Sequence, residues 1–186
     1  PGDKSHPGTE SGSYRGDKYQ TDYMDSKYEA YLLVKKAVEE RGLNAISVHP
    51  TFMIGPYDSK PSSGAMILAL VKGKVPGYTA GGRNYICVKD AATGIANALT
   101  SGKAGESYIL GHENLSYQEA FRKFATVLGV KAPSIFFPKP VVLLFGKLNE
   151  WMERFFGKPA KITSAMTRIS LDEHYYSSEK AVKEID

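Results

Sequence analysis

Apolar and polar residues alternate along the chain with the periods of helices and of short buried strands. Residues 22–41 place apolar side chains at helical spacing and end before Gly42, which predicts an amphipathic helix. Thr21 or Asp22 is expected to cap the start of this helix. Residues 44–49 form a short apolar run that Pro50 ends, and such a run is typical of a buried parallel strand. Helix and strand in this order favour an α/β fold.

The same two periods continue after a polar loop at residues 57–64. Ser116 and Glu119 have the spacing of a capping box, so a helix is expected to start there and to end at Gly129. Asp90 is predicted to cap another helix. The remaining expected helices cover 65–72, 90–99, 141–156, 163–169 and a last segment from 176, and the remaining expected strands cover 84–88 and 106–110.

The segment 141–156 is the most apolar part of the chain, and Trp151 belongs to its apolar face. This face is interpreted as core or as the wall of a pocket, in preference to a membrane-facing surface. If the indole is buried, Trp151→Ala should cost about 3–5 kcal/mol. Cys87 lies between Ile86 and Val88 and is expected to be a small buried hydrophobe rather than a nucleophile.

Composition narrows the class of protein. The formal charge is +4 and the basic residues are scattered, so no nucleic-acid-binding stripe is predicted. A single cysteine excludes an internal disulfide and favours a reducing, cytoplasmic location. No apolar run reaches the roughly 18 residues that a membrane span requires. No metal site is predicted.

Tyr23 and Lys27 are the residues that indicate chemistry. They lie four residues apart in the first predicted helix, so their side chains share one face. A phenol has an ordinary pKa of about 10, and a lysine ammonium one turn away favours the phenolate. Such a pair can act as a general acid and base on a carbonyl oxygen. Spacing alone does not select it, because four other pairs share it: Tyr14/Lys18, Tyr31/Lys35, Tyr85/Lys89 and Tyr176/Lys180.

The sequence around Tyr23 is more specific than the spacing. It reads Y-x-x-S-K-x-E on the helix, and the strand that follows ends in H-P-T-F-M-I-G-P. This combination resembles the short-chain dehydrogenase/reductase superfamily, and within it the extended branch of dihydroflavonol reductases, 3β-hydroxysteroid dehydrogenases and nucleotide-sugar epimerases. The resemblance covers nearly the whole chain but corresponds to the C-terminal portion of the family.

The resemblance implies an enzyme that uses NAD or NADP and moves a hydride between nicotinamide and a carbonyl or secondary alcohol of a small molecule. Tyr23 would donate the proton, and Lys27 would hold the ribose and tune the phenol. The alternatives are an epimerase or dehydratase of the same scaffold, and a non-catalytic member that binds a dinucleotide or a partner protein. The implied cofactor-binding residues are Tyr23, Lys27, Pro50, Thr51, Phe52 and Met53, and the expected substrate-binding residues are Tyr57, Arg83, Asn84 and Tyr85.

The resemblance also predicts how the chain is divided. Residues 1–56 and 88–111 are expected to be part of a Rossmann-type doubly wound parallel sheet, and 57–87 and 112–186 a smaller, mostly helical substrate-binding region. The family's catalytic Ser or Thr and its glycine-rich turn are missing from this sequence. The strands at 45–49 and 106–110 are therefore expected to be interior strands of an incomplete sheet, in a chain that is not an enzyme by itself. A second copy or an N-terminal half would complete it.

Overall fold

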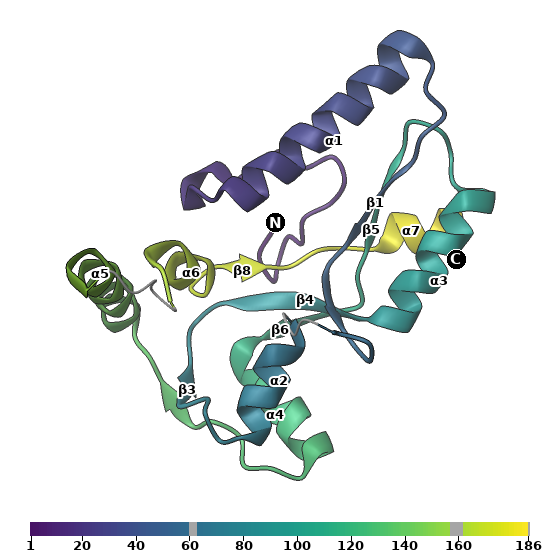
Figure 1. Ribbon diagram of the computed structural model, residues 1–186. Helices are drawn as coiled ribbons and strands as arrows, with labels where there is room; N and C mark the ends of the chain where they lie inside the picture. Colours follow the sequence, from purple (N-terminus) through teal and green to yellow (C-terminus); the bar gives the residue numbers. More distant parts are fainter. Residues whose placement is uncertain (60–62, 157–161, 186) are drawn as a thin grey trace. The chain divides into compact units, whose positions relative to one another are not determined.

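The computed structural model describes residues 1–59, 63–156 and 162–185. It is a mixed α/β structure with parallel strands, which confirms the predicted fold class (Figure 1). Contacts divide the chain into two compact units. Unit 1 comprises Pro1–Ser63, Asn84–Asn114 and His174–Asp186, and unit 2 comprises Gly64–Arg83 and Leu115–Glu173.

Unit 1 contains a two-stranded parallel sheet and the helices next to it. Strands β1 and β5 pair in parallel, from Ser47 opposite Ser107 to Pro50 opposite Leu110. The elements of unit 1 are η1 (Asp17–Tyr19), α1 (Asp22–Arg41), β1 (Ser47–Pro50), β2 (Phe52–Ile54), α3 (Val88–Ser101), β5 (Ser107–Leu110) and α7 (Glu179–Ile185).

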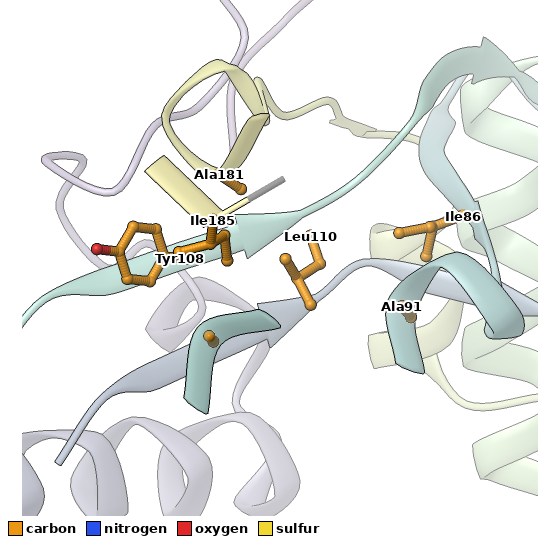
Figure 2. Close-up of a cluster of buried hydrophobic side chains, with 7 residues drawn as sticks. Ile86, Ala91, Tyr108, Leu110, Ala181 and Ile185 are labelled. Carbon is orange, nitrogen blue, oxygen red and sulfur yellow. The ribbon is translucent and has the colours of Figure 1, made fainter. Parts of the chain in front are cut away.

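The core of unit 1 forms where α3 and α7 pack on β5 (Figure 2). Tyr108 is fully buried, and its hydroxyl donates to Glu184 Oε2 at 3.1 Å, so α7 is tied to the strand by a polar contact as well as by packing. The buried members of this cluster are Ile86, Ala91, Ala98, Tyr108, Leu110, Ala181 and Ile185.

The outer edge of β5 is closed by side chains from two other segments. Lys180 Nζ donates to Ser107 O, Glu10 Oε1 accepts from Ile109 N, and Ser178 Oγ donates to the Gly111 carbonyl just beyond the strand. Side chains that satisfy an edge prevent another strand from pairing there. The expectation that β5 is an interior strand is therefore wrong within the described residues. Strand β1 is half-buried, and in the described part of the chain β5 is its one partner within their sheet.

Helix α1 has the predicted bounds, and Gly42 ends it in the left-handed conformation at φ 64°. Thr21 occupies the N-cap position, but its side chain makes no capping hydrogen bond. The expected apolar stripe is present in sequence, yet no residue of α1 is buried, and Leu33 is 69% exposed.

Unit 2 is mostly helical and has its own core. Helices α2 and α4 pack through Leu70 and Phe121, and Ser116 with Glu119 forms the predicted capping box at the start of α4. Its elements are α2 (Ser63–Val71), β3 (Gly77–Tyr78), α4 (Tyr117–Leu128), β7 (Ile135–Phe136), α5 (Lys139–Phe156) and α6 (Ser164–Ile169), and β3 pairs in parallel with β7.

A second sheet follows the order β2-β4-β6, and β8 also pairs with β4. Strand β4 (Gly82–Cys87) pairs in parallel with β2, while β6 (Glu113–Ser116) and β8 (Glu173–His174) are short. Cys87 ends β4 as the N-cap of α3 and is exposed, so the prediction of a buried cysteine is wrong. Asp90 lies in the first turn of α3 rather than at its cap, where it still complements the helix dipole.

Helix α5 forms as predicted, but the expected burial of its tryptophan is wrong. Trp151 is 55% exposed because the residues that face α6 are on the other side of the helix. Among the described residues, no helix is long and apolar enough to cross a membrane.

The two compact units do not coincide with the predicted segments. His174–Asp186 belongs to unit 1 through the contacts of α7 with α3 and β5, although the prediction placed it in the substrate-binding region. Compactness does not assign a cofactor or substrate role to either unit, so the functional division stays a prediction.

Candidate functional site

The candidate site begins with two side chains on the first turns of α1. Lys27 Nζ lies 5.9 Å from the centroid of the Tyr23 ring, which is the arrangement expected for residues four apart on a helix. The Tyr23 side chain is 73% exposed. Ser26, between them, donates its hydroxyl to the Tyr23 carbonyl at 3.1 Å, so it supports the helix rather than the phenol.

Tyr31 fixes α1 against the parallel pair of strands. Its ring meets the His49 ring edge-on at 5.3 Å, and its hydroxyl accepts from Ser107 Oγ at 3.3 Å. Tyr23 lies eight residues earlier, about 12 Å along the helix. Because α1 runs opposite to β1, this places Tyr23 toward the carboxyl end of the strand (Figure 1). Ligands of α/β proteins bind at that end of the sheet.

Tyr14, in the first of the four rival pairs, is poorly suited to proton transfer. Its hydroxyl donates to Asp25 Oδ1 at 2.6 Å, and its ring stacks on Tyr28 at 4.2 Å. Desolvation and the hydrogen bond to the Asp25 carboxylate raise the pKa of Tyr14 to about 12. A phenol with this pKa is a weaker acid than an ordinary tyrosine.

In two of the other three Tyr/Lys pairs, one member is buried or takes part in a hydrogen bond that holds the fold together. The same is true of the lysine of the third pair. The Tyr31 hydroxyl is hydrogen-bonded to Ser107, and Tyr85 is buried in β4. Lys180 is committed to Glu106 Oε2 at 2.6 Å and to the Ser107 carbonyl at 2.9 Å. Of the five pairs, Tyr23/Lys27 combines an exposed phenol, a contacting ammonium and a position toward the strand ends.

Glu10 is a residue near β1 and β5 that the sequence analysis missed. Its carboxylate accepts the Ile109 N–H at 2.8 Å. Desolvation lowers the pKa of the neighbouring His49, and the negative charge of Glu10 opposes that shift. Glu10 is separated from Ile109 by 99 positions in the sequence, so no local pattern indicates the contact.

The four residues implied to meet the nicotinamide join the two sheets. Pro50 ends β1, and the Thr51 N–H donates to the Leu110 carbonyl at 2.9 Å. Phe52 and Met53 then begin β2. This segment lies at the carboxyl end of β1, but its contact with a cofactor stays a prediction.

The expected substrate-binding residues lie in different surroundings. Tyr57 is 94% exposed and has a positive φ of 71°, whereas Asn84 and Tyr85 are buried in β4. Arg83 donates from Nε to Tyr117 Oη at 2.9 Å. Because Asn84 and Tyr85 are buried, their packing in β4 already explains why these residues stand there. A substrate role for any of the four residues stays a prediction.

Comparison with known proteins gives the family to which this chain belongs. Over 168 residues the chain is 34% identical to a putative dihydroflavonol 4-reductase of Synechocystis, an alignment that covers 88% of this chain and 49% of the relative. The crystal structure of gox2253 superimposes with a TM-score of 0.80 at 35% identity, covering 97% of this chain and 55% of that one. A nucleoside-diphosphate-sugar epimerase from Pseudomonas aeruginosa superimposes with a TM-score of 0.77 at 24% identity, covering 100% and 56%, which shows the shared fold.

Residues 1–111 match the NAD dependent epimerase/dehydratase family. The chain therefore belongs to this family, and its fold is that of the extended short-chain dehydrogenases/reductases. It spans about half the length of the putative dihydroflavonol 4-reductase that it matches. The predicted family is confirmed.

Proposed function

We propose that this chain carries the proton-transfer residues of an NAD(P)-dependent oxidoreductase that acts on a carbonyl or secondary alcohol. The observation that carries the proposal is the contact of the exposed Tyr23 phenol with Lys27 toward the carboxyl ends of β1 and β5. Membership of the NAD dependent epimerase/dehydratase family supports it, because members of such a family need a group that moves a proton.

The residues near Tyr23 fit the nicotinamide end of a dinucleotide. Bound nicotinamide supplies or accepts the hydride. Tyr23 Oη donates the proton to the substrate oxygen during reduction and removes it during oxidation. Lys27 provides a positive charge beside the phenol and a donor for ribose hydroxyls. Within the described residues, no glycine-rich turn joins a strand to a helix in the way that pyrophosphate binding requires, so the fit concerns the nicotinamide end alone.

The substrate class follows from the relatives and is a proposal. The similarity to a putative dihydroflavonol 4-reductase favours net reduction of a small-molecule carbonyl. An epimerase or dehydratase is the second candidate, and the family match favours it. These two reactions differ in cofactor use: a reductase consumes NADH or NADPH, whereas an epimerase returns the hydride to its own substrate.

Tyr23→Phe tests the proton donor. In the full-length protein we expect kcat to fall by about 10²–10⁴-fold, because the ring remains and the exchangeable proton is lost. The dissociation constant for NADPH, measured by nicotinamide fluorescence, should stay within a few fold. Tyr14→Phe is the matched control, since it removes the phenol of the rival pair and should retain activity. Substantial turnover by Tyr23→Phe would refute the assignment.

Lys27→Ala separates the roles of the two residues. It should weaken cofactor binding and lower kcat, because both the ribose contact and the charge beside the phenol are lost. Net consumption of NADPH with a carbonyl substrate would support the reductase. Interconversion of sugar nucleotides by protein with tightly kept NAD, and with no net consumption, would support the epimerase. Binding of a dinucleotide without either reaction would favour a non-catalytic member.

A further inference from the structure

Helix α5 has two chemically different sides. One side packs on α6, where Gly146 lets the two helices approach closely: a Cβ at this position would lie 2.6 Å from Thr167 Oγ1. On the same side, the Glu150 carboxylate accepts from both the N–H and the hydroxyl of Ser164 at 2.6 Å. Helices α5 and α6 lie beside each other within unit 2 (Figure 1). This side of α5 is therefore occupied.

The other side of α5 presents large apolar side chains to solvent. Trp151 and Phe155 contact each other, with ring centroids 4.5 Å apart, and they are 55% and 67% exposed. Helical spacing gathers the exposed apolar residues into an arc of roughly 120° around the axis. This surface, called the α5 stripe below, includes Val141, Leu144, Phe145, Leu148, Trp151 and Phe155.

The charges of α5 are segregated with respect to the α5 stripe. Lys147 and Arg154 are seven residues apart, so both lie along the same border of the stripe. Glu150 and Glu153 lie on the side turned away from it. Long basic side chains at the border of an apolar face can cover it with their methylene groups and reach lipid phosphates with their charges. Acidic groups would be repelled by the same phosphates, and here they point elsewhere.

This distribution decides between the candidate occupants of the stripe. A helix from a second copy would be selected by apolar area alone, and it gives no reason for cations to border the stripe while carboxylates avoid it. An anionic bilayer surface gives that reason, and exposed Trp and Phe are typical of helices that lie in the interfacial region. Because no described helix is long and apolar enough to span a membrane, α5 would lie in the plane of the surface.

We propose that α5 binds the surface of membranes that contain anionic lipids, with the α5 stripe inserted at the boundary between headgroups and acyl chains and with Lys147 and Arg154 on the lipid phosphates. The proposal concerns unit 2 and does not depend on the reaction proposed for Tyr23. Each of the two parts of the surface, the apolar arc and the basic border, has a separate consequence that can be measured.

Trp151 reports on the proposal directly, because it is the single tryptophan of the chain. The full chain would be titrated with vesicles of phosphatidylcholine alone and of phosphatidylcholine mixed with phosphatidylglycerol. With the mixed vesicles we expect the Trp151 emission to move to shorter wavelength and to be quenched by brominated acyl chains. Emission that is unchanged by the mixed vesicles, or that escapes quenching, would overturn the proposal without any variant.

Two double variants separate the apolar and the basic contributions. Leu148→Ser with Phe155→Ser should weaken binding to mixed vesicles by about tenfold or more. Its control is Val127→Ser in α4, which removes an apolar side chain that is 86% exposed. Lys147→Ala with Arg154→Ala should weaken binding by about tenfold through lost charge. Its control, Arg122→Ala with Lys131→Ala, removes the same charge elsewhere in unit 2 and should bind nearly as well as the unmodified chain.

Two further results would decide between membrane binding and the alternatives. Equal binding by the charge variant and its control would mean that overall charge, not the border of the stripe, attracts the protein, and would overturn the proposal. Sedimentation equilibrium without vesicles tests the other occupant: a dimer that Leu148→Ser with Phe155→Ser dissociates would assign the stripe to a second copy. Circular dichroism of each variant verifies that α5 and the rest of the fold remain.

Discussion

Asn84 is the buried polar residue whose replacement tests the structure of unit 1 most sharply. Its side chain is 2% exposed and belongs to β4. Oδ1 accepts from Thr51 Oγ1 at 2.8 Å and from His112 N at 3.1 Å. Nδ2 donates to Asn114 Oδ1 at 2.8 Å and to Tyr176 O at 3.3 Å. One amide thus joins β4 to three other segments of the chain, which contain Thr51, His112 with Asn114, and Tyr176.

The loss of stability caused by Asn84→Ala depends on which hydrogen bonds the partners of Asn84 retain. His112 N still donates to Tyr85 O at 3.1 Å, and Tyr176 O still accepts from Asn114 Nδ2 at 3.0 Å. Asn114 Oδ1 also keeps the Tyr176 N–H at 3.0 Å. The Thr51 hydroxyl therefore carries most of the loss. The unsatisfied hydroxyl of half-buried Thr51, together with the small cavity, should lower the free energy of unfolding by about 2–4 kcal/mol.

Asn84→Asp should be worse than Asn84→Ala at neutral pH, although aspartate has nearly the shape of asparagine. The carboxylate oxygen that replaces Nδ2 would face Asn114 Oδ1 and Tyr176 O, which are both acceptors. A buried charge without a compensating partner costs about 3–5 kcal/mol. The introduced carboxyl would have a raised pKa in the folded state, so the deficit should shrink as the pH falls and protonation provides a donor.

Urea denaturation followed by far-UV circular dichroism measures both variants against the unmodified chain. Asn44→Asp is the matched control, because Asn44 is exposed and its replacement should change the free energy of unfolding by less than about 0.5 kcal/mol. If Asn84→Asp proved as stable as Asn84→Ala across the pH range, the oxygen that replaces Nδ2 would not face two acceptors, and the reasoning would fail.

Two further predictions concern the helix contacts of each unit. Gly146→Ala should destabilise the protein by about 1–3 kcal/mol, because the added methyl group would meet Thr167. In thermal unfolding, adding Thr167→Ala should restore part of the lost stability. A fully stable Gly146→Ala variant would contradict the close approach of the two helices. The hydrogen bond from Lys103 holds the pKa of Glu184 below its ordinary value. Glu184 therefore stabilises the fold at pH values above the ordinary pKa of glutamate, and this contribution is lost as the pH falls through the folded-state pKa. Glu184→Gln should lower the unfolding temperature at neutral pH and flatten its acid dependence, and parallel profiles would exclude the contribution.

Local patterns predicted those parts of the structure that depend on residues close in sequence. Helix α1 and its Gly42 end follow from apolar spacing and from the conformational freedom of glycine, and the Ser116–Glu119 capping box joins residues three apart. The Tyr23/Lys27 contact belongs to this group, because four residues of helix fix it whatever surrounds the helix. Local patterns did not predict burial. Trp151 and Cys87 are exposed despite their apolar neighbours in sequence, because burial depends on which residues from elsewhere in the chain pack against a side chain.

The five Tyr/Lys pairs have the same spacing, so spacing does not distinguish them. The structure does distinguish them, because it shows which of the pairs make contacts with distant segments. Tyr14 and Tyr23 have the same spacing to a lysine, yet desolvation and the hydrogen bond to the Asp25 carboxylate raise the pKa of Tyr14, while Tyr23 remains exposed. Spacing also gives no information on the position of α1 along β1, which the contact between Tyr31 and His49 determines. The strongest argument for Tyr23 is therefore the pairing of a local arrangement, which the sequence predicts, with a long-range one, which places that arrangement toward the ends of two parallel strands where ligands of this fold bind.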